Sequence, residues 1–349
     1  GSMPKTIQFG FCVPIFANPG MTFFRTPAYE RLEWATTRDA VMECEALGYD
    51  SVFVADHLFL GRDGAIFEGW TLLAALAGLT RRMRLAPIHL CDSFRNPSLT
   101  AKMIATLDII SSGRVILFYD YGWRRAEFDA YGFGFESSDN ERAAKMVEGL
   151  EIIKGMLTQP RFSFYGRYYR VDDALCEPKP VQCPLPPIWM GEANNPVMVR
   201  AIARHADVFN SMPASTAAFR QKLAIVQRAC EVEGRDFNTI GRSLETQVLI
   251  GETDAEIDGA FERIAALRPA ERSDQDILAQ LQATNPTLGS YGSRQTLEQE
   301  FLIGTPDEVI RRLREYTDLG VTHFMLWFMD FPSLDGIRLF AREVMPKFR

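Results

Sequence analysis

Several ionisable side chains stand where apolar strands are predicted to end. His57 follows Asp56 directly after one such strand, and Asp120 ends another, between two tyrosines. An imidazole beside a carboxylate can move protons near pH 7, and a carboxylate among aromatic residues is costly unless it is paired or used. Active sites of parallel α/β folds lie at the carboxyl ends of strands. The pattern predicts proton transfer at these residues. The structural alternatives are a capping role for Asp56, a packed His57, and a salt bridge from Asp120 to Arg124 or Arg125.

The positions of the other three histidines indicate a functional role less strongly than that of His57. His89 lies inside an apolar strand, two residues before Cys91, where a histidine is more often part of the core. His205 falls in the last turn of a predicted helix, where its charge would suit the helix dipole. His323 begins the final strand at its amino end, which is the stability face of a barrel. We expect His205 and His323 to be structural.

The turn from Gly191 to Pro196 joins a predicted strand to a helix. Backbone N–H groups at a helix N-terminus bind phosphate, although Asn194 or Asn195 equally suits a simple N-cap. Trp327 near the end of the last strand would either line an apolar mouth or fill the core. The turn is thus a candidate anion site, and Trp327 is a candidate for an apolar wall.

Strands and helices alternate along the whole chain, so these side chains would be held at one edge of a parallel sheet. Helix, glycine and strand joints recur, as at Gly48 and Gly113, and no G-x-G-x-x-G motif follows any strand. We therefore predict an α/β fold, a single (β/α)8 TIM barrel spanning 1–349, in preference to a doubly wound open sheet. The eight strands are expected near residues 5–13, 49–55, 83–91, 113–120, 188–191, 208–209, 244–251 and 322–329.

Two polar segments interrupt the alternation and are expected at the carboxyl-terminal face of the barrel. Residues 121–140 form an aromatic loop, and residues 270–300 form a long polar stretch of the kind that serves as a lid. Capping boxes at Thr253–Glu256 and Thr305–Glu308 predict helix starts. Gly1–Met3 resembles an expression-tag scar and is set aside.

Composition limits the class of protein. The formal net charge is −7, which disfavours nucleic acid and anionic membranes as partners, and no apolar run reaches the roughly 18 residues of a membrane span. The six cysteines are scattered without a C-x-x-C pair, as expected for free, mostly buried thiols in a reducing cytoplasm. Four histidines without paired ligand spacing predict no metal site.

Longer stretches carry a family resemblance. The chain resembles the bacterial luciferase-like superfamily of flavin- or deazaflavin-dependent oxidoreductases over nearly its whole length. The stretches that carry it are 47–57, Phe94–Pro97 with 101–103, Ser112–Arg114, Gly122–Trp123 with Glu127–Phe128, Pro178–Gln182, Ala203–Asp207 and Gly304–Glu308. No single stretch is specific, but together they are.

The resemblance implies a TIM barrel with an insertion lid, usually a homodimer. It implies reduced FMN supplied by a partner flavin reductase, with O₂ as co-substrate, or a reduced deazaflavin for hydride transfer. The family's catalytic histidine matches His57, and its acidic neighbour matches Asp56. The segment that supports the isoalloxazine ring matches Cys91 and Asp92. The phosphate-binding turn matches Glu192, Ala193, Asn194 and Asn195.

This chain departs from the family at the ring site. Phe118 and Asp120 stand where many relatives have small residues, and His89 replaces a common aliphatic residue. Because Asp120 and His89 lie on neighbouring predicted strands, an Asp–His pair is expected there. Our first hypothesis is an FMN-dependent monooxygenase acting on a small organic substrate. The second is a deazaflavin-dependent oxidoreductase, and the third is a barrel without cofactor that does non-redox chemistry or binding.

Overall fold

The computed structural model describes residues 6–267, 276, 277, 279 and 293–349. These residues form two compact units. The first unit contains 1–68, 211–221 and 242–349, and the second contains 69–210 and 222–241. Helix α7 (Thr216–Glu233) contributes residues to both.

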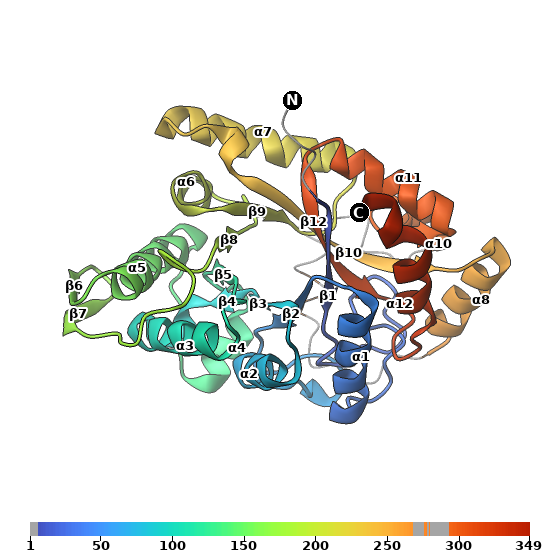
Figure 1. Cartoon of the computed structure of the whole chain (residues 1–349), viewed down its shortest axis with the longest axis horizontal. Coiled ribbons are helices and arrows are strands. Elements are labelled where there is room, and N and C mark those ends of the chain that lie inside the picture. The colour runs from blue at the N-terminus through green and yellow to red at the C-terminus, as the bar shows by residue number, and fades with distance from the viewer. Residues whose placement is uncertain (1–5, 268–275, 278, 280–292) are drawn as a thin grey trace. The chain divides into compact units, whose positions relative to one another are not determined.

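The first unit holds a parallel sheet with the strand order β2-β1-β12-β10-β11. Its strands are almost entirely buried, as is typical of parallel strands covered on both faces. Phe9 of β1 lies opposite Phe324 of β12. The elements, labelled in Figure 1, are β1 (Gln8–Cys12), α1 (Trp34–Leu47), β2 (Ser51–Ala55), β10 (Gly241–Ile250), α8 (Asp254–Ala265), α10 (Arg294–Leu297), β11 (Leu302–Gly304), α11 (Pro306–Thr317), β12 (Val321–Phe328) and α12 (Asp335–Leu339).

The second unit holds a parallel sheet with the order β4-β5-β8-β9. Strand β3 joins it through a bridge between Leu85 and Val115. An antiparallel hairpin, β6–β7, lies beside α5 in Figure 1. The elements are α2 (Gly69–Leu79), β3 (Arg84–Ile88), β4 (Leu90–Cys91), α3 (Pro97–Ile110), β5 (Leu117–Asp120), α4 (Arg125–Tyr131), α5 (Asp139–Thr158), β6 (Phe162–Tyr165), β7 (Arg170–Ala174), β8 (Ile188–Met190), α6 (Pro196–His205) and β9 (Val208–Ser211).

The alternation of parallel strands and helices confirms the predicted (β/α)8 barrel class. Local signals also act as predicted: Pro97 opens α3 behind the N-cap Asn96, and Thr305 with Glu308 forms a complete capping box on α11.

Other details differ from the prediction. Strand β11 was not predicted, and α4 lies within 121–140, which was predicted as a loop. The predicted lid at 270–300 lies outside the described residues, apart from residues 276, 277, 279 and 293–300. The predicted tag scar also lies outside them.

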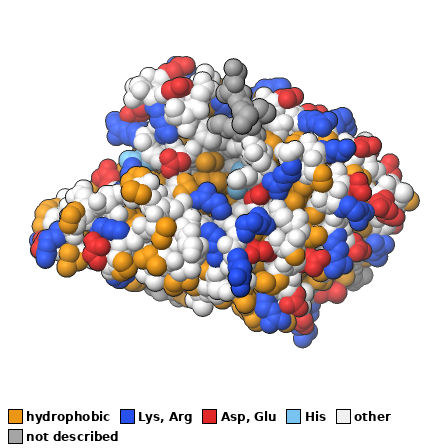
Figure 2. Space-filling view, in the orientation of Figure 1, with side chains coloured by type: hydrophobic (Ala, Val, Ile, Leu, Met, Phe, Trp, Pro, Cys, Tyr) orange, Lys and Arg blue, Asp and Glu red, His pale blue; other side chains and the backbone are white. Residues whose placement is uncertain are grey.

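The cysteines, potential metal ligands and surface charges are described next, together with the apolar character of the helices. All six cysteines are free; Cys183 is exposed and the other five are buried. Within the described ranges, no helix combines the length and the apolar character needed to cross a membrane. The same residues contain no cluster of three or more potential metal ligands. Acidic and basic side chains are interspersed on the face shown in Figure 2.

Candidate active site

The Asp120 carboxylate and the His89 imidazole lie side by side in the second unit. His89 sits between β3 and β4, and Asp120 ends β5, which pairs with β4 in parallel. Nδ1 of His89 is 3.4 Å from Oδ2 of Asp120, and the other carboxylate oxygen accepts a 2.7 Å hydrogen bond from the N–H of Tyr121. The His89 ring packs edge-on against Phe118, with centroids 4.4 Å apart. The structure thus contains the expected Asp–His pair.

The arginines named as alternative partners of Asp120 form ion pairs on α4 or beside it. Arg124 lies 3.5 Å from Glu127, and both side chains are almost fully buried. Arg125 lies 3.2 Å from Asp129 at the surface.

Asp92 belongs to the opposite face of the same sheet. Leu90 lies opposite Tyr119 and Cys91 opposite Asp120, so alternation sends Tyr119 and Asp92 to the side that α5 covers. The buried Asp92 carboxylate accepts hydrogen bonds from the hydroxyls of Tyr119 and Tyr169, the latter at 2.6 Å.

Helix α5 packs closely against the Asp92 carboxylate. A Cβ at Gly149 of α5 would lie 2.0 Å from Oδ1 of Asp92, so only glycine allows this approach. Burial raises the pKa of Asp92 to about 7, against the opposing effect of the two tyrosine hydrogen bonds.

The predicted phosphate turn is held by side chains from two other elements. The hydroxyl of Tyr121 donates to Oδ1 of Asn194 and accepts from Nδ2 of Asn195, both at 2.9 Å. Asn195 caps α6 by accepting from the N–H of Met198. Nζ of Lys222, on α7, lies 2.8 Å from Oε1 of Glu192. Ala193 is partly buried between these residues.

Asp56 and His57 follow β2 and belong to the first unit, whereas the other predicted site residues belong to the second. Asp56 is buried and His57 is partly exposed. Their position after a buried parallel strand is the predicted one.

A buried charged cluster in the first unit was not predicted. Nε of Arg25 lies 3.3 Å from Oε2 of Glu245, which also accepts a 2.7 Å hydrogen bond from Nε1 of Trp327. Oε1 of Gln247 accepts the N–H of Arg25 at 2.6 Å. The signal in the sequence was the pair Glu245 and Gln247, polar residues at alternate positions of the strand predicted at 244–251. Lys222 and Tyr169 were missed for lack of any such signal.

The two histidines expected to be structural have structural contacts. Nε2 of His323 lies 2.7 Å from Oγ of Ser51 within the first sheet. For His205, the expected charge interaction with the helix dipole is wrong. Burial and nearby Lys154 lower its pKa to about 4, so the ring is neutral at pH 7.

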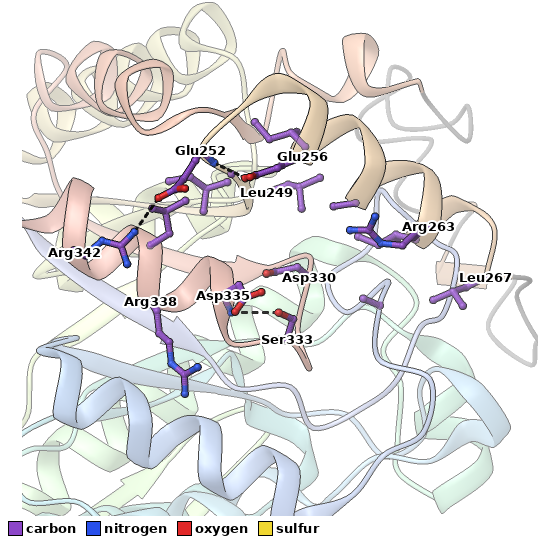
Figure 3. A pocket seen from close by; sticks show the side chains of 17 residues that line it. Leu249, Glu252, Glu256, Arg263, Leu267, Asp330, Ser333, Asp335, Arg338 and Arg342 are labelled. Carbon is purple, nitrogen blue, oxygen red and sulfur yellow. Dashed lines mark hydrogen bonds and ion pairs between the residues drawn. The ribbon is translucent and has the colours of Figure 1, made fainter.

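A pocket of about 620 Å³ lies in the first unit and contains none of the predicted site residues. It lies between α8, the end of β10, and α12 with the segments on either side of it, as Figure 3 shows. Arg342 pairs with Glu252 at 3.2 Å, and Oδ2 of Asp330 accepts the N–H of Gly336, whereas Oδ1 of Asp330 is buried without a hydrogen-bond partner among the described residues.

Comparison with known proteins identifies the family and agrees with the fold. Residues 8–323 match the family model described as luciferase-like monooxygenase. An F420-dependent glucose-6-phosphate dehydrogenase from Segniliparus rotundus is 27% identical over 310 residues, covering 87% of this chain and 91% of that protein.

Two solved structures show the same fold. An F420-dependent secondary alcohol dehydrogenase, in complex with an F420-acetone adduct, has a TM-score of 0.75 at 19% identity and covers 99% of both chains. The EDTA monooxygenase from Chelativorans sp. BNC1 has a TM-score of 0.76 at 18% identity, covering 99% of this chain and 94% of that one.

Proposed function

The chain belongs to the luciferase-like monooxygenase family, and we propose that it is an oxidoreductase that uses a deazaflavin of the F420 type. The observation that carries this proposal is the similarity, over 87% of this chain, to a relative named as F420-dependent. From the sequence alone we ranked reduced FMN first and a deazaflavin second. Because of this similarity, we now rank the deazaflavin first. The substrate would be a small molecule with a hydroxyl or carbonyl group.

The turn at residues 192–195 suits the anionic part of such a cofactor. Pro196 has no N–H, and Asn195 already accepts the N–H of Met198, so the helix end offers few donors of its own. Lys222 supplies the positive charge, and an arriving phosphate would compete with Glu192 for it. The hydrogen bonds of Tyr121 to both asparagines hold the turn in place before anything binds.

In this proposal, the cofactor would accept or donate a hydride when bound. His57 would move the accompanying proton at its imidazole, and Asp56 would orient that ring. Lys222, Asn194 and Asn195 would hold the phosphate-bearing end. Main-chain atoms of Cys91 and Asp92 would support the ring.

The test is anaerobic titration of the purified chain with F420 and with FMN, each in its oxidised and reduced forms, followed by absorbance and calorimetry. We expect F420 to bind. Lys222→Met should weaken that binding at least tenfold, and Arg228→Met, on the same helix, should leave it unchanged. Failure of F420 to bind the wild-type chain would refute the proposal.

For the reaction itself, we expect His57→Ala to lower turnover by about 10²–10⁴-fold, the usual contribution of a proton-transfer group, while F420 still binds. The screen would use small alcohols with F420 and carbonyl compounds with its reduced form. An unchanged turnover in His57→Ala would show that His57 has only a packing role.

The second candidate is an FMN-dependent monooxygenase with a partner flavin reductase, which the description of the matching family favours. It predicts tight binding of reduced FMN and substrate-dependent uptake of O₂. Binding of neither cofactor would instead favour a barrel with non-redox chemistry.

A further inference from the structure

The His89–Asp120 pair has the geometry of a proton-transfer dyad. Asp120 is fixed on one side by the N–H of Tyr121 and faces Nδ1 of His89 on the other. A carboxylate at this distance favours the tautomer that carries its proton on Nδ1. The ring cannot turn freely because Phe118 packs edge-on against it.

The other ring nitrogen, Nε2, is buried and has no hydrogen-bond partner among the described residues. A buried polar atom without a partner is uncommon in folded proteins and invites an explanation. The side chains of His89 and Asp120 nevertheless keep 21% and 16% of their surface exposed, so the pair borders accessible space. A ligand with an acidic O–H or N–H could complete the contact that the protein leaves open.

The pair lies on the sheet face opposite α5, because Tyr119, the residue between Phe118 and Asp120, points toward α5. Trp189 of the neighbouring strand packs against Phe118 on that face, with centroids 6.0 Å apart. Phe118 therefore covers one side of the His89 ring, and Trp189 packs behind Phe118 on the same sheet face.

We propose that His89 is a second catalytic residue of this chain and that Asp120 is the residue that positions it. Nε2 accepts one proton from a hydroxyl or ring N–H of the bound ligand, and the imidazolium that forms is balanced by the Asp120 carboxylate. The reverse transfer returns the proton. The identity of the ligand rests on the proposed function, but the tautomer of His89 does not.

The first test needs no cofactor. The chain has four histidines, so selective ¹⁵N labelling of histidine gives few ring signals, and His89→Gln identifies those of His89. At pH 8 we expect the proton on Nδ1 and a bare Nε2. Asp120→Asn should move the proton toward Nε2, whereas Asp207→Asn, a matched change elsewhere in the second unit, should not. A wild-type ring with its proton on Nε2 would overturn the proposal.

The second test uses F420 and FMN as probes. The cofactor that binds should shift the Nε2 signal of His89, and His89→Gln should lower kcat by about 10²-fold or more with a smaller change in KM. Asp120→Asn should lower kcat less and change its pH profile, and His205→Gln should change neither. An unshifted Nε2 signal together with an unchanged kcat in His89→Gln would overturn the proposal. If neither cofactor binds, the proposed function fails, and the tautomer measurement alone decides whether the dyad exists.

Discussion

At the scale of single residues, two neighbouring side chains on one strand have opposite roles. Asp120 faces His89, whereas Tyr119 faces the buried Asp92 behind the sheet. The period of two in a strand accounts for this division. The sequence showed a polar strand end but not which side each residue would face, so the contacts of Asp92 with Tyr119 and Tyr169 were not predicted.

The buried Asp92 makes stability depend on pH in a definite direction. Its folded pKa of about 7 lies above that of an unfolded aspartate, about 3.9. The unfolded chain loses this proton first as pH rises. The contribution to stability is therefore complete below about pH 4 and is lost between about pH 4 and pH 7.

We expect Asp92→Asn to remove this dependence. Between pH 5 and pH 8, the free energy of unfolding of the wild type should fall relative to that of the variant, by on the order of 2 kcal/mol. Chemical denaturation at both pH values measures the difference. Asp129→Asn, at the surface, is the control, and a constant gap between wild type and Asp92→Asn would contradict the assignment.

At the scale of elements, hydrogen bonds to the carboxylate of Glu148 on α5 connect the hairpin β6–β7 to that helix. Glu148 accepts the N–H of Arg167 at 2.6 Å through Oε1, and those of Tyr168 and Tyr169 at 2.8 and 3.0 Å through Oε2. Tyr169 then reaches Asp92 through its hydroxyl. The hairpin thereby connects the helix to the buried carboxyl group.

Removing this carboxylate should loosen the hairpin. We expect Glu148→Ala to lower the free energy of unfolding by about 1–3 kcal/mol, because three backbone donors lose a charged acceptor. Hydrogen exchange of residues 162–174 should accelerate more than exchange elsewhere. Glu151→Ala, at an exposed position of the same helix, should have little effect; equal acceleration in both variants would argue against the tie.

Helix starts were predicted correctly where the sequence signal lies within a few residues of the helix end. Pro97 and the capping box at Thr305 mark helix starts because their chemistry acts within one turn. The cluster of Arg25, Glu245 and Trp327 could not be predicted, because its members lie far apart in the chain and meet only through the sheet. The ion pair of Lys222 with Glu192 could not be predicted either, because the two residues are also far apart in the sequence.

At the scale of the molecule, the expected homodimer has a testable surface. Ile110 and Leu99 are large apolar residues on the same helix, α3, and they expose 61% and 56% of their surface. We expect the wild type to sediment as a dimer of 39.5 kDa chains and Ile110→Glu to shift it toward monomer. Val232→Glu is the control, since Val232 is exposed on another helix. Monomeric wild type would refute the expectation.

The distribution of the thiols has a practical consequence. Five of the six cysteines are buried, and burial raises the pKa of Cys12 and Cys44, which keeps them in the unreactive thiol form. Cys183 alone is exposed among the six. The natural sequence therefore carries a single attachment point for a maleimide dye or a spin label. Distances between two copies, or changes on cofactor binding, could be followed without introducing or removing any cysteine.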